Sequence, residues 1–197
     1  MNRPFTIGLT GSIGMGKSTT GELFKEHGAD VWNADDAVHR LYEPGGAGVS
    51  AIQNIRPEAV VAGAVSRPCL KAWIAEDPTA LPRIEAVIHP LVKTDRQKFL
   101  ANSPSDIVVL DIPLLFETAA DEAFDLIVVV SAPPDLQRAR VLARPGMSDT
   151  HFECILAKQM PDAEKREKAD RVIETVDLET ARQAVEKIVR EIRAGDA

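Results

Sequence analysis

The sequence lacks the cysteine patterns and the long apolar runs that mark disulfide-rich, zinc-binding or membrane-spanning proteins. It has two cysteines among 197 residues, Cys69 and Cys154, and their spacing fits neither a disulfide framework nor a zinc site. It has no run of 18 apolar residues, and the apolar segment near its start is short and interrupted by Gly11 and Ser12. We therefore expect a cytoplasmic protein without a membrane span, a signal peptide or a structural disulfide.

Basic residues are outnumbered by acidic ones. The chain has 23 Lys and Arg against 30 Asp and Glu, which gives a formal net charge of −7. A broad surface for nucleic acid or for an anionic membrane is therefore not expected. Any anion that binds must be met by a local group of cations. The length suits one medium domain, or one domain with an insertion, and predicts no particular oligomeric state.

The sequence does contain a phosphate-binding loop. Residues 11–18, GSIGMGKS, match the pattern G-x-x-x-x-G-K-[ST] between an expected strand, 5–10, and a helical pattern, 19–27, that Gly28 ends. In such a loop, backbone N–H groups and a helix N-terminus bind phosphate, the lysine adds a mobile charge, and the serine can ligate Mg²⁺. We expect a nucleotide to contact Gly11, Gly14, Met15, Gly16, Lys17, Ser18 and Thr19.

Apolar, β-rich runs alternate with helical patterns along the chain. They predict strands at 5–10, 30–33, 107–110, 126–130 and 171–174, and an amphipathic helix over 178–192. The runs 107–110 and 126–130 are apolar throughout, which favours strands buried on both faces of a parallel sheet. The prediction is an α/β fold with a doubly wound parallel sheet of about five strands and ligands at the strands' C-terminal ends.

Residues 36–104 interrupt this alternation. They contain no clear strand except one near 59–62, and their helix-like stretches are punctuated by Pro57, Pro68, Pro78, Pro82 and Pro90. The interval is too long for a simple crossover between neighbouring strands. We predict a helical insertion that binds a second substrate, with residues 1–35 and 105–197 as the nucleotide-binding core. The glycine-rich residues 45–48 are interpreted as a loop.

Two carboxylates follow predicted strands at the edge where ligands bind. Asp35 comes directly after the strand 30–33 and could accept the proton of an attacking hydroxyl group. A helix cap at Asp35 or Asp36 explains the same position equally well. Asp111 ends the run 107–110 and could hold Mg²⁺ directly or through water, although aspartate also ends many strands for turn reasons.

Arginines gather on a short helix predicted after the fourth strand. Gln137, Arg138, Arg140 and Arg144 lie there, and a spacing of four places Arg140 and Arg144 on one face. Two guanidinium groups on one face suit a lid, residues 137–160, that closes over transferring phosphates. In this hypothesis Arg140 is catalytic and Arg144 binds the nucleotide. A solvated basic face with salt bridges is the alternative.

Together the motifs resemble the dephospho-CoA kinase family, from Ile7 to about Ile192. The most family-specific string is DIPLLFE, residues 111–117. The other matching segments are residues 8–11 leading into 16–19, 34–35, 43–45 and 88–90, then Gln137 with Arg140 and Arg144, Gln159, Lys165 and 169–170.

The resemblance implies ATP and Mg²⁺ as cosubstrates and phosphorylation of the ribose 3′-hydroxyl of dephospho-CoA, the last step of coenzyme A synthesis. It also implies a nucleotide-binding core, a helical CoA domain and an arginine-bearing lid. Within these parts it implies Asp35 as the base, with Lys17 and Arg140 as the other catalytic groups. The substrate would contact His39, His89 and Leu115, and the metal would contact Ser18 and Asp111.

The chain departs from the family pattern at three places. The family often has Asp-Ala-Asp where this chain has NAD at 33–35, arginine where it has His39, and Asp-Arg where it has SR at 66–67. These changes leave the presumed base in place, so they bear on substrate affinity more than on the reaction.

Three other functions fit the sequence less well. A small GTPase needs D-x-x-G, which is absent, and N/T-K-x-D; the K-x-D spacings at Lys93 and Lys168 follow Val92 and Glu167. A kinase of the same core could act on another small acceptor, such as a nucleoside monophosphate. The string at 111–117 and the long insertion argue against that acceptor. A catalytically silent nucleotide-binding module is disfavoured because the phosphate loop and both acidic positions are present.

Overall fold

The computed structural model describes residues 3–118 and 124–195, which form two compact units. Unit 1 comprises the chain up to Trp32 and from Ser103 onward, and unit 2 comprises Asn33–Asn102. The limits of unit 2 differ by two to three residues from those predicted for the insertion.

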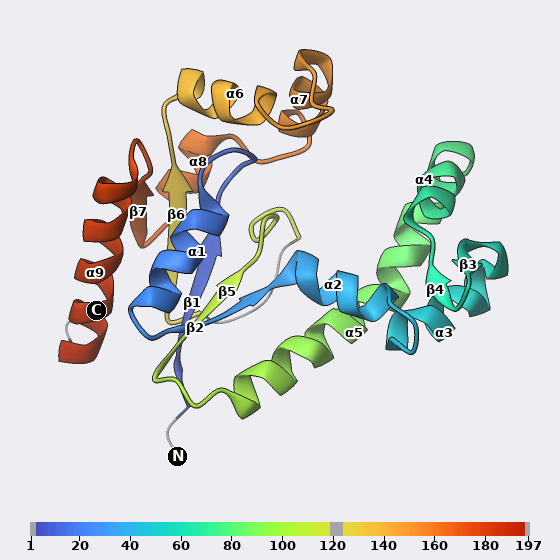
Figure 1. Cartoon of the computed structure of the whole chain (residues 1–197), viewed down its shortest axis with the longest axis horizontal. Helices are drawn as coiled ribbons and strands as arrows, with labels where there is room; N and C mark the ends of the chain where they lie inside the picture. The colour runs from blue at the N-terminus through green and yellow to red at the C-terminus, as the bar shows by residue number, and fades with distance from the viewer. Residues whose placement is uncertain (1–2, 119–123, 196–197) are drawn as a thin grey trace. The chain divides into compact units, whose positions relative to one another are not determined.

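Unit 1 is built on a sheet. In the described part of the chain this sheet has the order β2-β5-β1-β6-β7 (Figure 1). Its strands are β1 (Phe5–Thr10), β2 (Asp30–Asn33), β5 (Ile107–Asp111), β6 (Leu126–Ser131) and β7 (Arg171–Glu174). β1 pairs in parallel with β5 and β6, and β6 with β7. The α/β prediction is confirmed, and all the predicted strands form within one residue of their expected bounds.

Two helices of unit 1, α1 (Lys17–Glu26) and α9 (Leu178–Ala194), share one buried cluster with the sheet. Alternate strand residues such as Ile7 and Leu9 meet Phe24 of α1 and Val185 of α9 there. Because alternate residues of a strand point to one face, α1 and α9 cover the same face of the sheet. α1 ends as predicted, with Gly28 in the left-handed region at φ 85.

The segment after β6 contains α6 (Pro134–Leu142), α7 (Asp149–Leu156) and α8 (Asp162–Glu167). α6 and α7 lie beyond the C-terminal ends of the strands (Figure 1). They are joined by Arg138, which donates to Asp149 and, at 2.8 Å, to Glu153. Arg138 also lies over the ring of Phe152, 5.8 Å from its centre.

The prediction that Arg140 and Arg144 share a helical face is wrong. α6 ends at Leu142, and the N–H of Arg144 donates instead to the carbonyl of Val141. Pro145 follows Arg144, and a residue before proline is pushed away from helical geometry. Arg144 is exposed beyond the helix.

Unit 2 has its own apolar core, to which Ile52, Leu70, Trp73, Ile84 and Ile88 contribute. Its helices are α2 (Ala34–Tyr42), α3 (Ala47–Ile55), the 3₁₀ turn η1 (Pro57–Ala59), α4 (Arg67–Glu76) and α5 (Ala80–Asn102). A small antiparallel hairpin joins β3 (Val60–Val61) to β4 (Ala64–Val65). Its two turn residues, Ala62 and Gly63, both have positive φ, as a type I′ hairpin turn requires.

Two local predictions for unit 2 need correction. The loop expected at 45–48 ends early, because α3 already begins at Ala47. A Cβ at Gly46 would lie 2.4 Å from the carbonyl oxygen of Leu41, so this glycine allows close backbone packing. Pro90 does not break a helix, since α5 runs through it. Ala86, whose carbonyl would have bonded the missing N–H, is exposed and can be hydrated.

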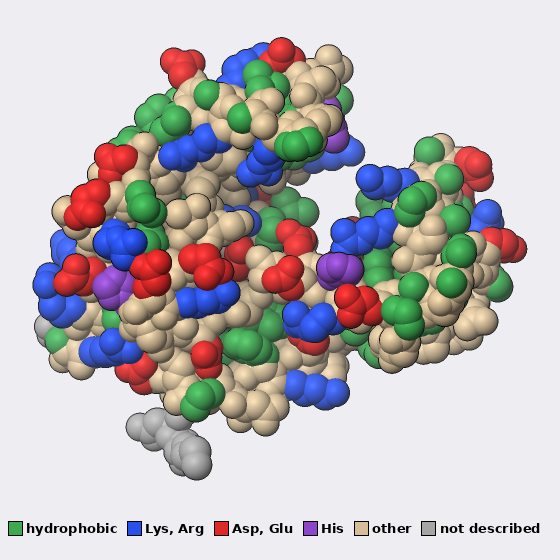
Figure 2. Space-filling model, viewed as in Figure 1, with side chains coloured by type: hydrophobic (Ala, Val, Ile, Leu, Met, Phe, Trp, Pro, Cys, Tyr) green, Lys and Arg blue, Asp and Glu red, His purple; other side chains and the backbone are tan. Residues whose placement is uncertain are grey.

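Acidic and basic side chains are interspersed over the face in Figure 2, but Lys and Arg gather along the lower edge of the α6–α7 segment. This is the kind of local cationic region that an acidic protein needs in order to bind an anion. No helix in the described ranges is both long and apolar enough to cross a membrane.

Candidate functional site

The predicted phosphate loop connects the end of β1 to the start of α1. Three of its glycines have positive φ: Gly11 at 156, Gly14 at 78 and Gly16 at 93. A Cβ at Gly14 would come within 2.5 Å of Val141 Cγ2, so both the backbone and the packing of α6 demand glycine. Gly16 is the N-cap of α1, and among the described residues no side chain caps this helix end. The N–H groups of the first turn therefore point into a site suited to an anion.

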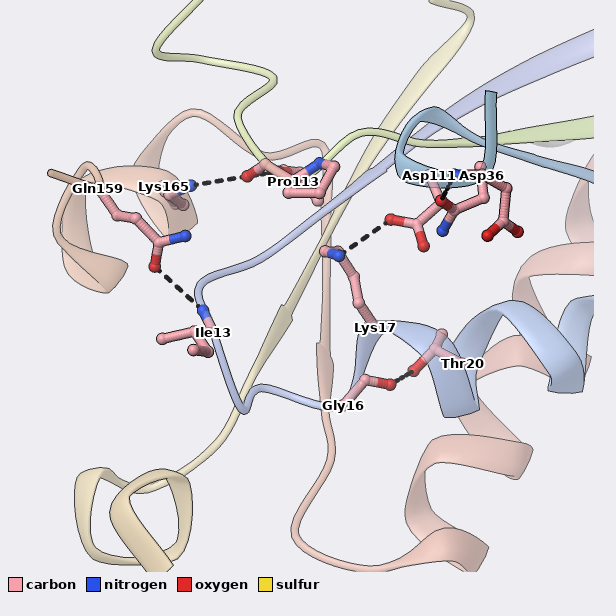
Figure 3. Close-up of polar contacts among 11 residues, drawn as sticks. Ile13, Gly16, Lys17, Thr20, Asp36, Asp111, Pro113, Gln159 and Lys165 are labelled. Carbon is pink, nitrogen blue, oxygen red and sulfur yellow. Dashed lines mark hydrogen bonds and ion pairs between the residues drawn. The ribbon is translucent and has the colours of Figure 1, made fainter. Parts of the chain in front are cut away.

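Lys17 and Asp111 meet beside this loop (Figure 3). Lys17 Nζ lies 3.1 Å from Asp111 Oδ1, and the Asp111 side chain is only 3% exposed. β5 pairs with β1 so that Asp111 stands opposite Leu9, just before the loop begins. The register of two strands distant in sequence thus brings the predicted phosphate-binding cation and the predicted metal ligand together.

Of the remaining residues of the loop and the first turn of α1, some are buried and some are exposed. Met15 is buried, and its Sδ accepts from the N–H of Ala132 at 3.0 Å, so any contact with a nucleotide would come from its backbone. Thr20 is also buried, and its hydroxyl donates to the carbonyl of Gly16 at 3.1 Å. Ser18 and Thr19 are exposed in the same turn and can reach a ligand.

Arg140 is joined to the phosphate loop through Thr175. Arg140 Nη1 donates to Thr175 Oγ1 at 3.1 Å, and Nη2 donates to the Thr175 carbonyl at 2.5 Å. Thr175 Oγ1 in turn donates to the carbonyl of Met15 at 2.7 Å. Thr175 is 5% exposed, and a Cβ at Gly16 would lie 2.9 Å from its hydroxyl. Thr175 therefore links the Arg140 guanidinium to the phosphate loop.

Asp35 lies in the first turn of α2, within unit 2. The cap of α2 is Asn33, whose Oδ1 accepts from the N–H of Asp36 at 3.0 Å. The alternative in which Asp35 or Asp36 caps the helix is therefore wrong, and both carboxylates are exposed. His39 is one turn after Asp35, on the same side of α2, and lies 3.8 Å from Glu43. His89 is exposed near the middle of α5.

Comparisons with known proteins agree with the motifs. The family model for dephospho-CoA kinase matches residues 5–179. A dephospho-CoA kinase of Cereibacter sphaeroides is 56% identical over 191 residues, which are 97% of each chain.

Solved structures agree as well. TT1252 from Thermus thermophilus is 32% identical, with a TM-score of 0.86 over 97% of this chain and 98% of that chain. A dephospho-CoA kinase from Campylobacter jejuni, 24% identical, has the same fold, with a TM-score of 0.71 over 98% of this chain and all of that one. This chain belongs to the dephospho-CoA kinase family.

The string shared with that family, residues 111–117, supplies one partner, Glu117, of an ion pair that its sequence does not predict. Lys165, which is 0% exposed, places Nζ 2.7 Å from Glu117 Oε1. Lys165 Nζ also lies 3.5 Å from the carbonyl of Pro113, and Glu117 accepts from the N–H of Met160 at 2.8 Å. Burial raises the pKa of Glu117, but its hydrogen bonds to Lys165 and Met160 outweigh this and hold the pKa below its usual value.

Leu115 of the same string is 4% exposed and packs inward. A Cβ at Gly8 would lie 2.9 Å from Leu115 Cδ1, so this leucine fills the space that Gly8 leaves. Its predicted contact with substrate would therefore have to come from its backbone.

The structure also explains one departure from the dephospho-CoA kinase pattern. Asn33 stands where the family often has aspartate, and its side chain caps α2. Asparagine and aspartate cap helices about equally well, so this change preserves the start of the helix that carries Asp35.

Two residues of the site were not found by sequence reasoning. Thr175 belongs to no local motif, and its contacts with Met15 and Arg140 join segments far apart in the chain. The role of Glu117 was likewise hidden, although it ends the family string. A second acidic residue at the end of the string, after the apolar residues 112–116, was the available signal.

Proposed function

We propose that this protein transfers the γ-phosphoryl group of ATP to the ribose 3′-hydroxyl of dephospho-CoA, giving coenzyme A and ADP. Family membership over nearly the whole chain supports the reaction. The observation that carries the proposal is the pairing of Lys17 with buried Asp111 at the N-terminus of α1, an end that no side chain of the described residues caps.

The donor phosphates are bound in this proposal by the loop and the N-terminus of α1. Lys17 moves from Asp111 to the β- and γ-phosphates and stabilises the negative charge that spreads as the phosphoryl group departs. A charge already held beside the loop needs little reorganisation to do this.

The residues present fit a magnesium ion. Ser18 supplies an exposed hydroxyl and Asp111 a carboxylate, which are the hard oxygen ligands that Mg²⁺ prefers. Within the described residues no group of three or more His, Cys, Asp and Glu could hold a metal alone. This suits Mg²⁺, which in kinases is bound by few protein ligands together with water and substrate phosphates. When bound, the ion neutralises charge on the transferring phosphates.

Asp35 is the proposed base for the acceptor hydroxyl. It is exposed at the start of α2, directly after β2, and its carboxylate is not used in capping the helix. Phosphoryl transfer with a loose transition state needs little proton abstraction, so Asp35 contributes mainly by orienting the hydroxyl in line with the γ-phosphate.

Arg140 is the proposed cation of the transition state. Its guanidinium can engage two phosphate oxygens at once, as it now engages the hydroxyl and carbonyl of Thr175. Arg144 is exposed beyond α6 and is proposed to contact the nucleotide.

A coupled assay of ADP release tests the proposal. Release should require dephospho-CoA, and the product should be coenzyme A by mass spectrometry. An analogue of dephospho-CoA lacking the ribose 3′-hydroxyl should compete with the substrate without being phosphorylated. Faster turnover with a nucleoside monophosphate would overturn the assignment of the acceptor.

A further inference from the structure

Ile13, in the middle of the phosphate loop, is bound by two glutamine side chains. Its N–H donates to Gln159 Oε1 at 3.0 Å (Figure 3), and its carbonyl accepts from Gln137 Nε2 at 2.7 Å. Both hydrogen-bonding groups of one loop residue are thus used by side chains. Since the N–H of Ile13 is engaged, phosphate binding falls to the N–H groups that follow it.

The two glutamines come from opposite ends of one segment. Gln137 lies on α6 and is 6% exposed, whereas Gln159 lies between α7 and α8 and is half-buried. Between them, Arg138 joins α6 to α7 through Asp149 and Glu153. The segment 137–159 therefore begins and ends on the same loop residue.

The region around Gln159 is itself fixed. The next residue, Met160, donates its N–H to Glu117, which pairs with buried Lys165. On the other side, Val141 of α6 packs so closely on Gly14 that a Cβ there would clash. Both glutamines thus stand on rigid supports, as residues that position a site must.

We propose that Gln137 and Gln159 are positioning residues that clamp Ile13 and hold the phosphate loop in the shape that binds ATP. Without the clamp the loop populates other conformations, and ATP must order it on binding, which lowers the apparent affinity. The clamp has a defined polarity, because position 159 must accept a hydrogen bond while position 137 must donate one.

Amide hydrogen exchange tests this polarity without using the reaction. The exchange of Ile13 is followed by NMR in the full-length protein without nucleotide. We expect Gln159→Met to speed exchange about tenfold, the effect of losing one net hydrogen bond. Gln159→Glu should keep the protection, because a carboxylate accepts the same bond. Unchanged exchange in Gln159→Met would overturn the clamp, as would equal loss in the Glu and Met variants.

Position 137 should give the opposite pattern. A carboxylate cannot donate to the carbonyl of Ile13, so Gln137→Glu should lose loop protection at least as much as Gln137→Met. Protection retained in Gln137→Glu would contradict the proposal. Gln183→Met is the matched control, because Gln183 is exposed on α9 and bonds only Glu179 among the described residues. Circular dichroism confirms folding, and the isosteric Glu variants cover the case in which a Met variant does not fold.

The kinetic consequence rests on the proposed function and separates loop positioning from a general structural role. Gln159→Met should raise KM for ATP about fivefold and leave KM for dephospho-CoA within about twofold. A rise confined to the KM for dephospho-CoA would show that the glutamine acts on the acceptor. If the wild-type protein does not phosphorylate dephospho-CoA, the proposed function fails while the exchange result still decides the clamp.

Discussion

Lys17 and Asp111 neutralise one another at 3.1 Å, although they lie far apart in the chain. Lys17 is the first residue of α1, and Asp111 is the last residue of β5. In the proposed reaction both residues exchange partners. Lys17 leaves the Asp111 carboxylate for a phosphate, which is also an anion. Asp111 leaves the Lys17 ammonium group for a metal ion, which is also a cation. Substrate binding therefore leaves neither charge buried and alone.

Replacing Lys17 tests the phosphate loop. Lys17→Ala should lower turnover by about 100-fold or more, because it removes a charge that stabilises the departing phosphoryl group. It should also reduce the free energy of unfolding by about 3 kcal/mol, since Asp111 loses the partner of a buried pair.

The kinetic effect of Lys17→Ala is measured by ADP release and its stability effect by urea unfolding. Lys25→Ala is the control, because Lys25 lies on the same helix, half-exposed, and pairs with Glu22. Normal turnover in a folded Lys17→Ala variant would refute the assignment.

The pair Asp35 and Asp36 offers a matched comparison for the base. Asp35→Asn should reduce turnover with saturating dephospho-CoA by about 10²- to 10⁴-fold, the usual contribution of a positioned base. Adjacent helical residues point about 100° apart, so Asp36→Asn should be nearly silent. ATP affinity, measured by isothermal titration, should change little in either variant. If Asp36→Asn is the damaging change, the base has been misassigned.

Arg140 should be sensitive to a change that keeps its charge. Lysine supplies a point charge and cannot make the paired contacts of a guanidinium, so Arg140→Lys should lose about 100-fold in turnover while binding ATP. Single-turnover kinetics together with ATP titration separate the two effects. Should Arg140→Lys be normal and Arg144→Lys be impaired, the catalytic arginine is the one beyond the helix.

Glu117 should make the protein sensitive to acid. Its pKa in the folded state lies below the ordinary value of 4.5, so the folded protein binds fewer protons here than the unfolded chain. The stabilisation is fully present above that value and is lost as the pH falls below it through the folded-state pKa.

The stability of Glu117→Gln should therefore depend less on pH below about 4.5 than that of the wild type. Urea unfolding measures this difference between about pH 3 and pH 6, the range in which carboxyl groups usually titrate. Lys165→Met should reduce the free energy of unfolding more at neutral pH than in acid, because at neutral pH it leaves the ionised Glu117 half-buried without its cation. Parallel pH profiles for the wild type and Glu117→Gln would contradict the assignment.

The sequence predicted most of unit 1 because its signals are local. Continuous apolar runs predicted β5 and β6, and the glycines and Lys17 predicted the loop before α1. In unit 2, Pro90 misled the interpretation of α5, since proline removes one hydrogen bond but an exposed carbonyl can be hydrated.

The parts of the site that were missed depend on contacts between distant segments. Nothing near Thr175 indicates that its hydroxyl bonds Met15, and nothing near Lys165 indicates that it is fully buried beside Glu117. A spacing of four would place Arg140 and Arg144 on one face of a continuous helix, but α6 ends at Leu142, before Arg144. Local patterns predict which elements form, whereas packing decides which side chains meet.

The central place of β1 in its sheet affects how the protein can fold during synthesis. Its neighbours, β5 and β6, begin at Ile107 and Leu126, so the nascent sheet cannot close until the ribosome has passed both. Unit 2 is continuous, Asn33–Asn102, and contains its own core, so it can fold first. Chains arrested when residue 102 has emerged from the ribosome but Leu126 has not should therefore yield a protease-resistant fragment of residues 33–102 before the amino-terminal strand is protected. Translation order would then make the inserted unit the first folded part of a chain whose sheet begins before it.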